Sequence, residues 1–236
     1  MTIVAGADGA PDGWALVFKE AGRCRVKRVE RLSQIFDGGS SPKIVAVDIP
    51  VGLLDAYETG GRQCDREARK CLGPKRGSSV FPAPVRPVLG ATSYQQAKEL
   101  SRRSAEDGKA ISKQTWAIVC KIFEVDDLLR TRPALRDVVR EVHPEVSFCE
   151  LAGRPMDHSK RKREGRDERR RALLQCFPNL DELVTRGRKA EGLAPEDIMD
   201  AVAACWSALR LADGRGRSLI EPVPRDSAGL PMTIWV

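Results

Sequence analysis

A short apolar run within residues 43–53, KIVAVDIPVGL, places the strongest limit on how this chain folds. Residues 44–47 are apolar and mostly β-branched, which is typical of a strand covered on both faces, usually a parallel strand in an α/β sheet. Asp48 follows, and then Pro50 and Gly52, which end a strand and turn the chain. Ligands of open α/β sheets collect beyond the carboxyl ends of the strands. Asp48 is therefore a candidate for chemistry as well as for a simple turn.

The chain opens with a similar pattern, because residues 2–7 are apolar and lead to Asp8. Residues 14–18 and 24–29 also have the composition of short strands, and Gly or Gly-Pro segments separate the three runs. A strand meander followed by a connection into the buried strand at 44–47 predicts a mixed sheet.

A further β-branched run at 138–142 follows predicted helices at 94–106 and 112–129. A strand reached through a helical crossover should be parallel to the strand before the crossover, here residues 44–47, with a right-handed connection. The carboxyl ends of the two strands should then share one sheet edge. Glu141 and Glu145 lie at that end, and Pro144 suits the first turn of a helix.

The last predicted helix begins at Pro195 and carries Asp197 and Asp200. Residues three apart are neighbours on one side of a helix, although acids also favour a first turn because of the helix dipole.

Three further elements are predicted from the sequence pattern. Residues 65–72 predict a short helix, and residues 218–223 and 232–236 predict late edge strands.

The bulk properties favour a single domain spanning residues 1–236. A chain of 236 residues can bury about 70% of its unfolded surface, and it has no apolar run long enough for a membrane span. The start of the chain lacks the pattern of a secretory signal, and seven scattered cysteines without a C-x-x-C pair argue against a disulfide framework or zinc site. We therefore expect a cytoplasmic protein.

Residues 55–92 form a basic, Pro- and Gly-rich excursion, and loops of this length are usually functional or mobile. A net charge of +7 is compatible with a polyanionic partner such as DNA or RNA. The alternative is a solvated surface. The candidate nucleic-acid contacts are Arg62, Arg66, Arg69, Arg76 and Arg86. The densest charge run, residues 159–171, carries both signs and is interpreted as a solvated helix face.

The acids at strand ends and at the last helix form a coherent set for metal binding. Carboxylates brought together repel one another unless a cation is present, and all-oxygen ligands favour Mg²⁺ or Mn²⁺. Such ions stabilise the attacking and leaving oxygens of phosphoryl transfer. Other kinds of active site find less support in the sequence. The chain has neither a P-loop nor a G-x-G-x-x-G motif, and its two histidines, His143 and His158, are too few for a metal site with three histidines.

Several motifs together resemble a family of uncharacterised bacterial proteins predicted to be ribonuclease-H-like nucleases, a domain-of-unknown-function family. They are GADGAPDGW, AVDIPVGL, RQCDREARKCLG, SSVFPAPVR, SKQTWAIVCKIFEVD, EVHPEVSF and DIMDAVAAC. The resemblance implies a ribonuclease-H-like α/β fold, with a five-stranded sheet of three antiparallel and two parallel strands between helices. The D-x-x-D helix is also similar to the last metal-binding helix of Holliday-junction resolvases.

The resemblance implies Asp8, Asp48, Glu145 and Asp200 as catalytic residues, and Asp8, Asp48, Asp197 and Asp200 as metal ligands. Glu145 is preferred to Glu141 because it should project from a helix start beyond the sheet edge. The chain departs from the resolvases at Asp48, where they tend to carry Glu. The expected function is a divalent-metal-dependent nuclease, and the alternative is a non-catalytic binding module for nucleic acid or an anionic small molecule.

Overall fold

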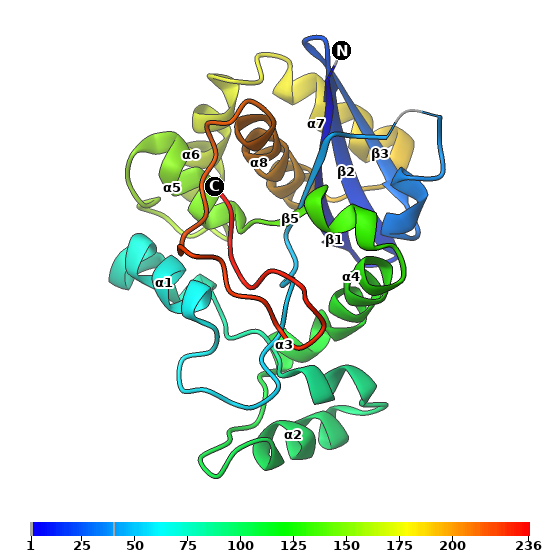
Figure 1. Cartoon of the computed structure of the whole chain (residues 1–236). Helices are drawn as coiled ribbons and strands as arrows, with labels where there is room; N and C mark the ends of the chain where they lie inside the picture. Colours follow the sequence, from blue (N-terminus) through cyan, green and yellow to red (C-terminus); the bar gives the residue numbers. More distant parts are fainter. Residues whose placement is uncertain (1, 40) are drawn as a thin grey trace.

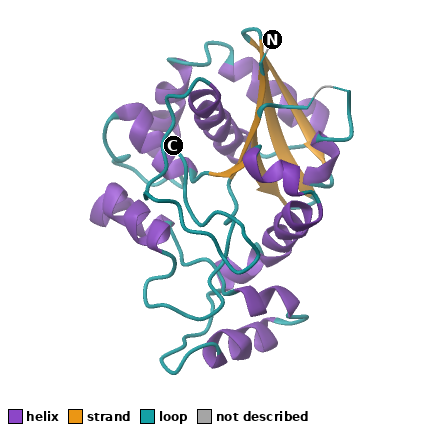
Figure 2. Cartoon of the chain, viewed as in Figure 1, coloured by secondary structure: helices purple, strands orange, loops and turns teal. Residues whose placement is uncertain are grey.

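A five-stranded mixed sheet forms the centre of the molecule in the computed structural model, which describes residues 2–39 and 41–236 (Figures 1 and 2). The strand order is β3-β2-β1-β4-β5. The antiparallel strands β1 (Ile3–Ala10), β2 (Gly13–Glu20) and β3 (Arg23–Val29) form one side of the sheet. Strands β4 (Ile44–Val47) and β5 (Val139–Glu141) continue it in parallel with β1. The predicted mixed sheet, with its crossover to a second parallel strand, is confirmed.

Successive side chains of the strands enter two separate cores, as the period of two requires. Val4 and Ile44 pack on the face covered by α8 (Pro195–Ala212), whereas Ala5 and Val45 pack against α4 (Val119–Thr131). Four further helices contribute to the α8 core: α1 (Gln63–Arg76), α5 (Pro144–Ala152), α6 (Arg163–Leu174) and α7 (Leu180–Glu191). Helices thus cover both faces of the sheet (Figure 1).

The excursion after β4 continues into a small third core around Val85, Val88 and Ala97. Helix α2 (Tyr94–Arg103) packs there and lies at the lower end of the molecule, away from the sheet (Figure 1). The remaining short helices are η1 (Leu32–Ile35), η2 (Gly77–Ser79), η3 (Arg86–Gly90), α3 (Lys113–Ala117) and η4 (Pro133–Asp137).

Several predicted elements differ in the structure. The helix expected at 112–129 is capped by Ser112 but is interrupted at Ile118, which leaves α3 and α4. Helix α1 is longer than predicted and changes direction at Gly73, whose φ is 63°. Helix α7 was not predicted, because Gly187 weakens its sequence pattern. A Cβ on Gly187 would lie 2.6 Å from Ile198 Cδ1, so glycine permits the contact of α7 with α8.

The late strands predicted at 218–223 and 232–236 are wrong. They form only an isolated bridge between Ser218 and Trp235, without a regular ladder. Trp235 N donates a hydrogen bond to Glu141 O at 2.8 Å, so the C-terminal segment covers the edge of β5. An unpaired strand edge is thereby protected.

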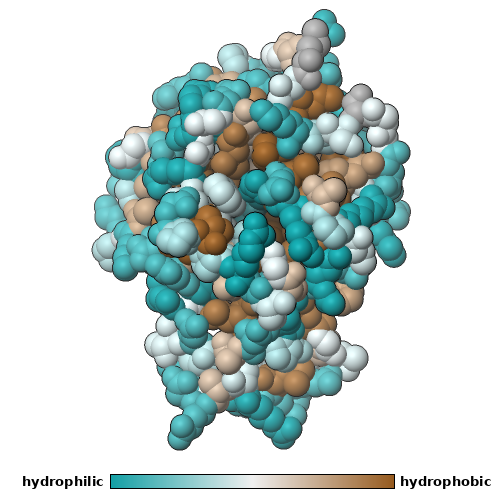
Figure 3. Space-filling view, in the orientation of Figure 1, coloured by the Kyte–Doolittle hydropathy of each residue, from teal (hydrophilic) through white to brown (hydrophobic). Residues whose placement is uncertain are grey.

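All seven cysteines are free thiols, and no helix among the described residues combines the length and apolar character needed to cross a membrane. The face drawn in Figure 3 is mostly hydrophilic, with small hydrophobic patches between polar side chains.

Helix α8 lies directly on β1 at Gly6. A Cβ on Gly6 would stand 2.1 Å from both Ala201 O and Cys205 N, so only glycine allows this approach. We expect Gly6→Ala to lower the free energy of unfolding by about 1–3 kcal/mol, since overpacking forces the backbone apart. Gly90→Ala is the control, because a Cβ there meets nothing within 4 Å. Urea unfolding measures both changes, and equal changes would contradict close packing at Gly6.

Candidate functional site

Asp8 and Asp48 lie next to each other near the carboxyl ends of parallel neighbours. Asp8 is within β1, and Asp48 directly follows β4, with Asp48 N donating to Ala7 O at 3.0 Å. Since Val4 and Ile44 pack toward α8, the alternation of side chains directs both carboxylates to that same face. The two strands pair in parallel, with Ala7 opposite Val47.

The start of α8 brings two further carboxylates to this place. Burial raises the pKa of Asp8 well above its usual range, and the charges of Asp200, Asp48 and Asp197 raise it further. Burial also raises the pKa of Asp48 to about 6, against an opposing effect of His143. Asp200 is only 4% exposed, whereas Asp8, Asp48 and Asp197 are half-buried. Three elements distant in sequence therefore place four acids within electrostatic reach of one another.

Lys160 supplies a positive charge to this carboxylate cluster, which we define as Asp8, Asp48, Asp197 and Asp200. Its Nζ lies 2.5 Å from Asp200 Oδ2, and its side chain remains 49% exposed. Burial lowers the pKa of Lys160, but Asp200, Asp48 and Asp8 outweigh burial and raise it overall. The ammonium thus serves several carboxylates at once.

Glu145 borders the cluster and is already paired. It is buried in the first turn of α5, and Arg169 Nη2 donates to its two oxygens at 2.5 and 2.7 Å. The charge of Glu145 contributes to raising the pKa of Asp48. Glu145 thus lies beside the carboxylate cluster, as expected from the sequence, but its charge is already paired with Arg169.

Glu141 points elsewhere. It pairs in register with Val47, so its side chain faces away from the side of the sheet that carries Asp48. Its carboxylate accepts hydrogen bonds from Arg62 at 2.5 and 2.8 Å and from Val51 N at 2.6 Å. Glu141 therefore holds the turn after β4 in place.

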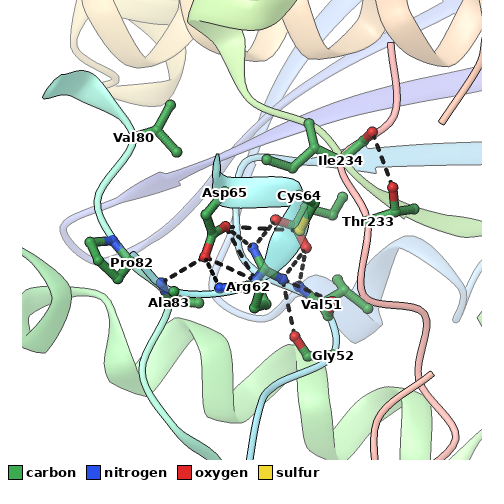
Figure 4. A network of polar contacts seen from close by, with 12 residues as sticks. Val51, Gly52, Arg62, Cys64, Asp65, Val80, Pro82, Ala83, Thr233 and Ile234 are labelled. Carbon is green, nitrogen blue, oxygen red and sulfur yellow. Dashed lines mark hydrogen bonds and ion pairs between the residues drawn. The ribbon is translucent and has the colours of Figure 1, made fainter. Parts of the chain in front are cut away.

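Arg62 lies at the centre of this buried network (Figure 4). It is 2% exposed, and it also pairs with Asp65 at 2.7 Å and donates to the carbonyl oxygens of Val51 and Gly52. A guanidinium enclosed in this way cannot follow a nucleic-acid backbone. Its role is structural, which differs from the sequence-based expectation.

The other arginines of the basic excursion also bond within the protein. Arg66 contacts Gly61 O and Glu58, and Arg69 donates to Val80 O and Gly60 O. Arg86 pairs with Asp126 and Asp226. Arg76 is half-buried, and its Nε has no partner among the described residues. These arginines mainly fold the excursion onto the domain.

The chemistry of the donors suits a hard divalent cation, since the cluster offers only carboxylate oxygens. Lys160 acts as a stand-in cation there, which shows that the cluster favours positive charge. Within residues 2–39 and 41–236, however, no three His, Cys, Asp or Glu side chains are already arranged around a single metal position. Holding an ion would require side-chain movement at Asp200, where Lys160 now sits.

A family model described as "Protein of unknown function (DUF429)" matches residues 6–225. The chain belongs to this family. No curated protein and no solved structure matches the chain. The DUF429 match contains the whole carboxylate cluster as well as Glu145 and Lys160. The family match confirms that the chain belongs to an uncharacterised domain-of-unknown-function family, as the resemblance in sequence implied.

A cavity of about 160 Å³ opens beside the cluster of this DUF429 protein. Its wall combines the apolar side chains of Val184, Pro195 and Met199 with charged side chains of both signs: Lys160, Arg166, Arg169 and Arg170, and Asp167, Asp181, Glu196 and Asp200. Arg170 is paired with Asp181, whereas Arg166 donates to Arg161 O. The cavity therefore adjoins Asp200 with an apolar surface bordered by charges of both signs.

Sequence reasoning missed Lys160, because the run at 159–171 was assigned to one solvated helix face. Helix α6 begins only at Arg163, so Lys160 lies in the preceding loop and is free of the helical pattern. No local signal shows that this loop reaches the sheet edge.

The raised pKa of Asp48 predicts a pH dependence for the metal-free protein. Folded Asp48 keeps its proton up to about pH 6, whereas unfolded Asp48 loses it near 3.8. Stability should therefore fall as pH rises from about 4 to about 6, by on the order of 2 kcal/mol for this half-buried group. Urea unfolding at pH 4.5 and 7 tests this, with Asp48→Asn as the comparison. If both proteins show the same pH dependence, the assignment to Asp48 is wrong.

Proposed function

We propose that the chain has a ribonuclease-H-like fold and is a divalent-metal-dependent nuclease that hydrolyses phosphodiester bonds of nucleic acid. The strand order, with three antiparallel strands followed by two parallel ones, supports the fold. The observation that carries the function is the convergence of Asp8, Asp48 and Asp200 from β1, β4 and α8. Acids that raise one another's pKa are typical of functional sites.

Asp8, Asp48 and Asp200 would hold Mg²⁺ or Mn²⁺, with Asp197 beside them on α8. A bound divalent ion supplies charge stabilisation to the attacking and leaving oxygens of the phosphodiester. Glu145, held by Arg169, borders the cluster as a further carboxylate whose charge is already compensated. The half-buried setting of Asp8 and Asp48 strengthens their electrostatic interactions relative to open water.

Contacts with nucleic acid are better assigned to the cavity than to the excursion. Arg166 is an exposed cation at its wall, Arg170 is exposed beside its partner Asp181, and Val184 and Met199 offer apolar surface to a base or sugar. Phosphate contacts position a nucleic acid without reading its sequence. DNA and RNA remain equal candidates in this proposal.

Labelled single- and double-stranded DNA and RNA, incubated with Mg²⁺, Mn²⁺ or a chelator, test the nuclease proposal. We expect cleavage by the parent protein with metal, and its loss with the chelator or with Asp8→Asn. Cleavage that survives both changes would point to a contaminant, and no cleavage of any substrate would count against the nuclease.

A second candidate function is a non-catalytic module that binds nucleic acid or an anionic small molecule. Its specific support is that Lys160 and Arg169 already neutralise Asp200 and Glu145 without a metal. This module would bind the same labelled oligonucleotides equally in Mn²⁺ and in chelator, and it would cleave none of them.

A further inference from the structure

Lys160 lies where it can regulate metal binding at the carboxylate cluster, provided that the proposed metal site exists. Lys160 is the only lysine or arginine among the described residues that forms an ion pair with a member of the carboxylate cluster. Its ammonium also lowers the pKa of Asp8 and of Asp48, although burial dominates both. It thus occupies the position at which a cation relieves the repulsion among the carboxylates.

The backbone before Lys160 is firmly held. Glu168 accepts hydrogen bonds from Asp157 N and His158 N, all at 3.1 Å, and Arg169 Nη1 donates to His158 O at 3.0 Å. A Cβ on Gly165 would lie 2.1 Å from Ser159 O, so α6 and this loop are in close contact. The loop therefore presents Lys160 to the cluster from a fixed base.

The side chain of Lys160, in contrast, borders open space. It is about half exposed and lines the cavity together with Asp200, so the cavity offers the ammonium a second position. A flexible four-carbon stem carries the ammonium as a compact point charge. Only the lysine end of this ion pair reaches solvent, since the side chain of Asp200 is 6% exposed.

We propose that Lys160 occupies the cation position of the carboxylate cluster in the metal-free protein and leaves Asp200 for the cavity when a divalent ion binds. Lys160 then competes with the metal, so the protein is stabilised without metal and its metal affinity is reduced. Removing the ammonium should have two opposite effects: a less stable metal-free protein and tighter metal binding.

The test is titration calorimetry with Mn²⁺ at pH 7.5, together with melting curves in chelator, on the parent protein and on Lys160→Met. We expect Lys160→Met to bind Mn²⁺ about tenfold more tightly, which corresponds to about 1.4 kcal/mol, and to melt at a lower temperature in chelator. Arg166→Met is the matched control, because it removes the same charge near the cavity without a contact to the cluster.

The outcomes separate this inference from the proposed function. If the parent binds Mn²⁺ and Lys160→Met binds it equally or more weakly, Lys160 does not compete and the metal site stands alone. An equal gain in Arg166→Met would show a general charge effect and overturn the inference as well. If neither the parent nor Lys160→Met binds Mn²⁺, both the metal site and the competition are wrong.

Discussion

Arg62→Met is expected to lower the free energy of unfolding by about 3–5 kcal/mol, because it leaves buried Glu141 and Asp65 without their cation. Arg62 is 2% exposed, and its guanidinium joins the start of α1 to the end of β5 and to the turn after β4. The loss comes from uncompensated buried charge as well as from missing hydrogen bonds. Urea unfolding at pH 7 measures it.

Arg186→Met is the control for this variant. Arg186 pairs with Glu182 on the exposed surface of α7, and such pairs contribute no more than about 1 kcal/mol. A combined variant with Arg62→Met, Glu141→Gln and Asp65→Asn should recover part of the stability, since the stranded charges are then gone. A loss for Arg62→Met no greater than that for Arg186→Met would contradict the structural role of Arg62.

The second large effect is expected at Asp48. In the parent protein, Mn²⁺ at a hundredfold excess over its dissociation constant should stabilise the fold by about 2.7 kcal/mol. Asp48→Asn removes one ligand and one repulsive charge, so most of that gain should disappear. The variant should also be more stable than the parent in chelator at pH 7.5, by on the order of 2 kcal/mol, since ionised Asp48 destabilises the fold.

Asp48→Glu helps to interpret this variant, because it keeps a carboxylate at this position. It should retain part of the response to Mn²⁺. If Asp48 merely caps the turn before Pro50, both variants should be less stable than the parent in chelator, and Mn²⁺ should affect none of the three proteins.

The strands and the placement of Asp8 and Asp48 were accessible from sequence, because local patterns determine them. A β-branched run that ends in an acid and a proline predicts a buried strand with a carboxylate at its end. The parallel arrangement of β4 and β5 then follows from the crossover rule. The predicted helix at Pro195 likewise places Asp200 on the sheet, and Gly6 sets how closely it approaches.

The choice between Glu141 and Glu145 depends on register, which the sequence does not fix. Glu141 is opposite Val47, and a shift of one residue would have turned it toward Asp48. The roles of Arg62 and Lys160 depend on partners 79 and 40 residues away, at Glu141 and Asp200. A basic composition looks the same whether an arginine faces solvent or a buried carboxylate, so these roles required the tertiary structure.

Differential scanning calorimetry of the parent and Asp48→Asn, each in chelator and in millimolar Mn²⁺, tests the carboxylate cluster most directly. A metal site predicts a higher melting temperature for the parent in Mn²⁺, a small response for Asp48→Asn, and a more stable Asp48→Asn in chelator. Equal melting temperatures of the parent in chelator and in Mn²⁺, together with a destabilised Asp48→Asn, would contradict a metal site at this edge of the sheet.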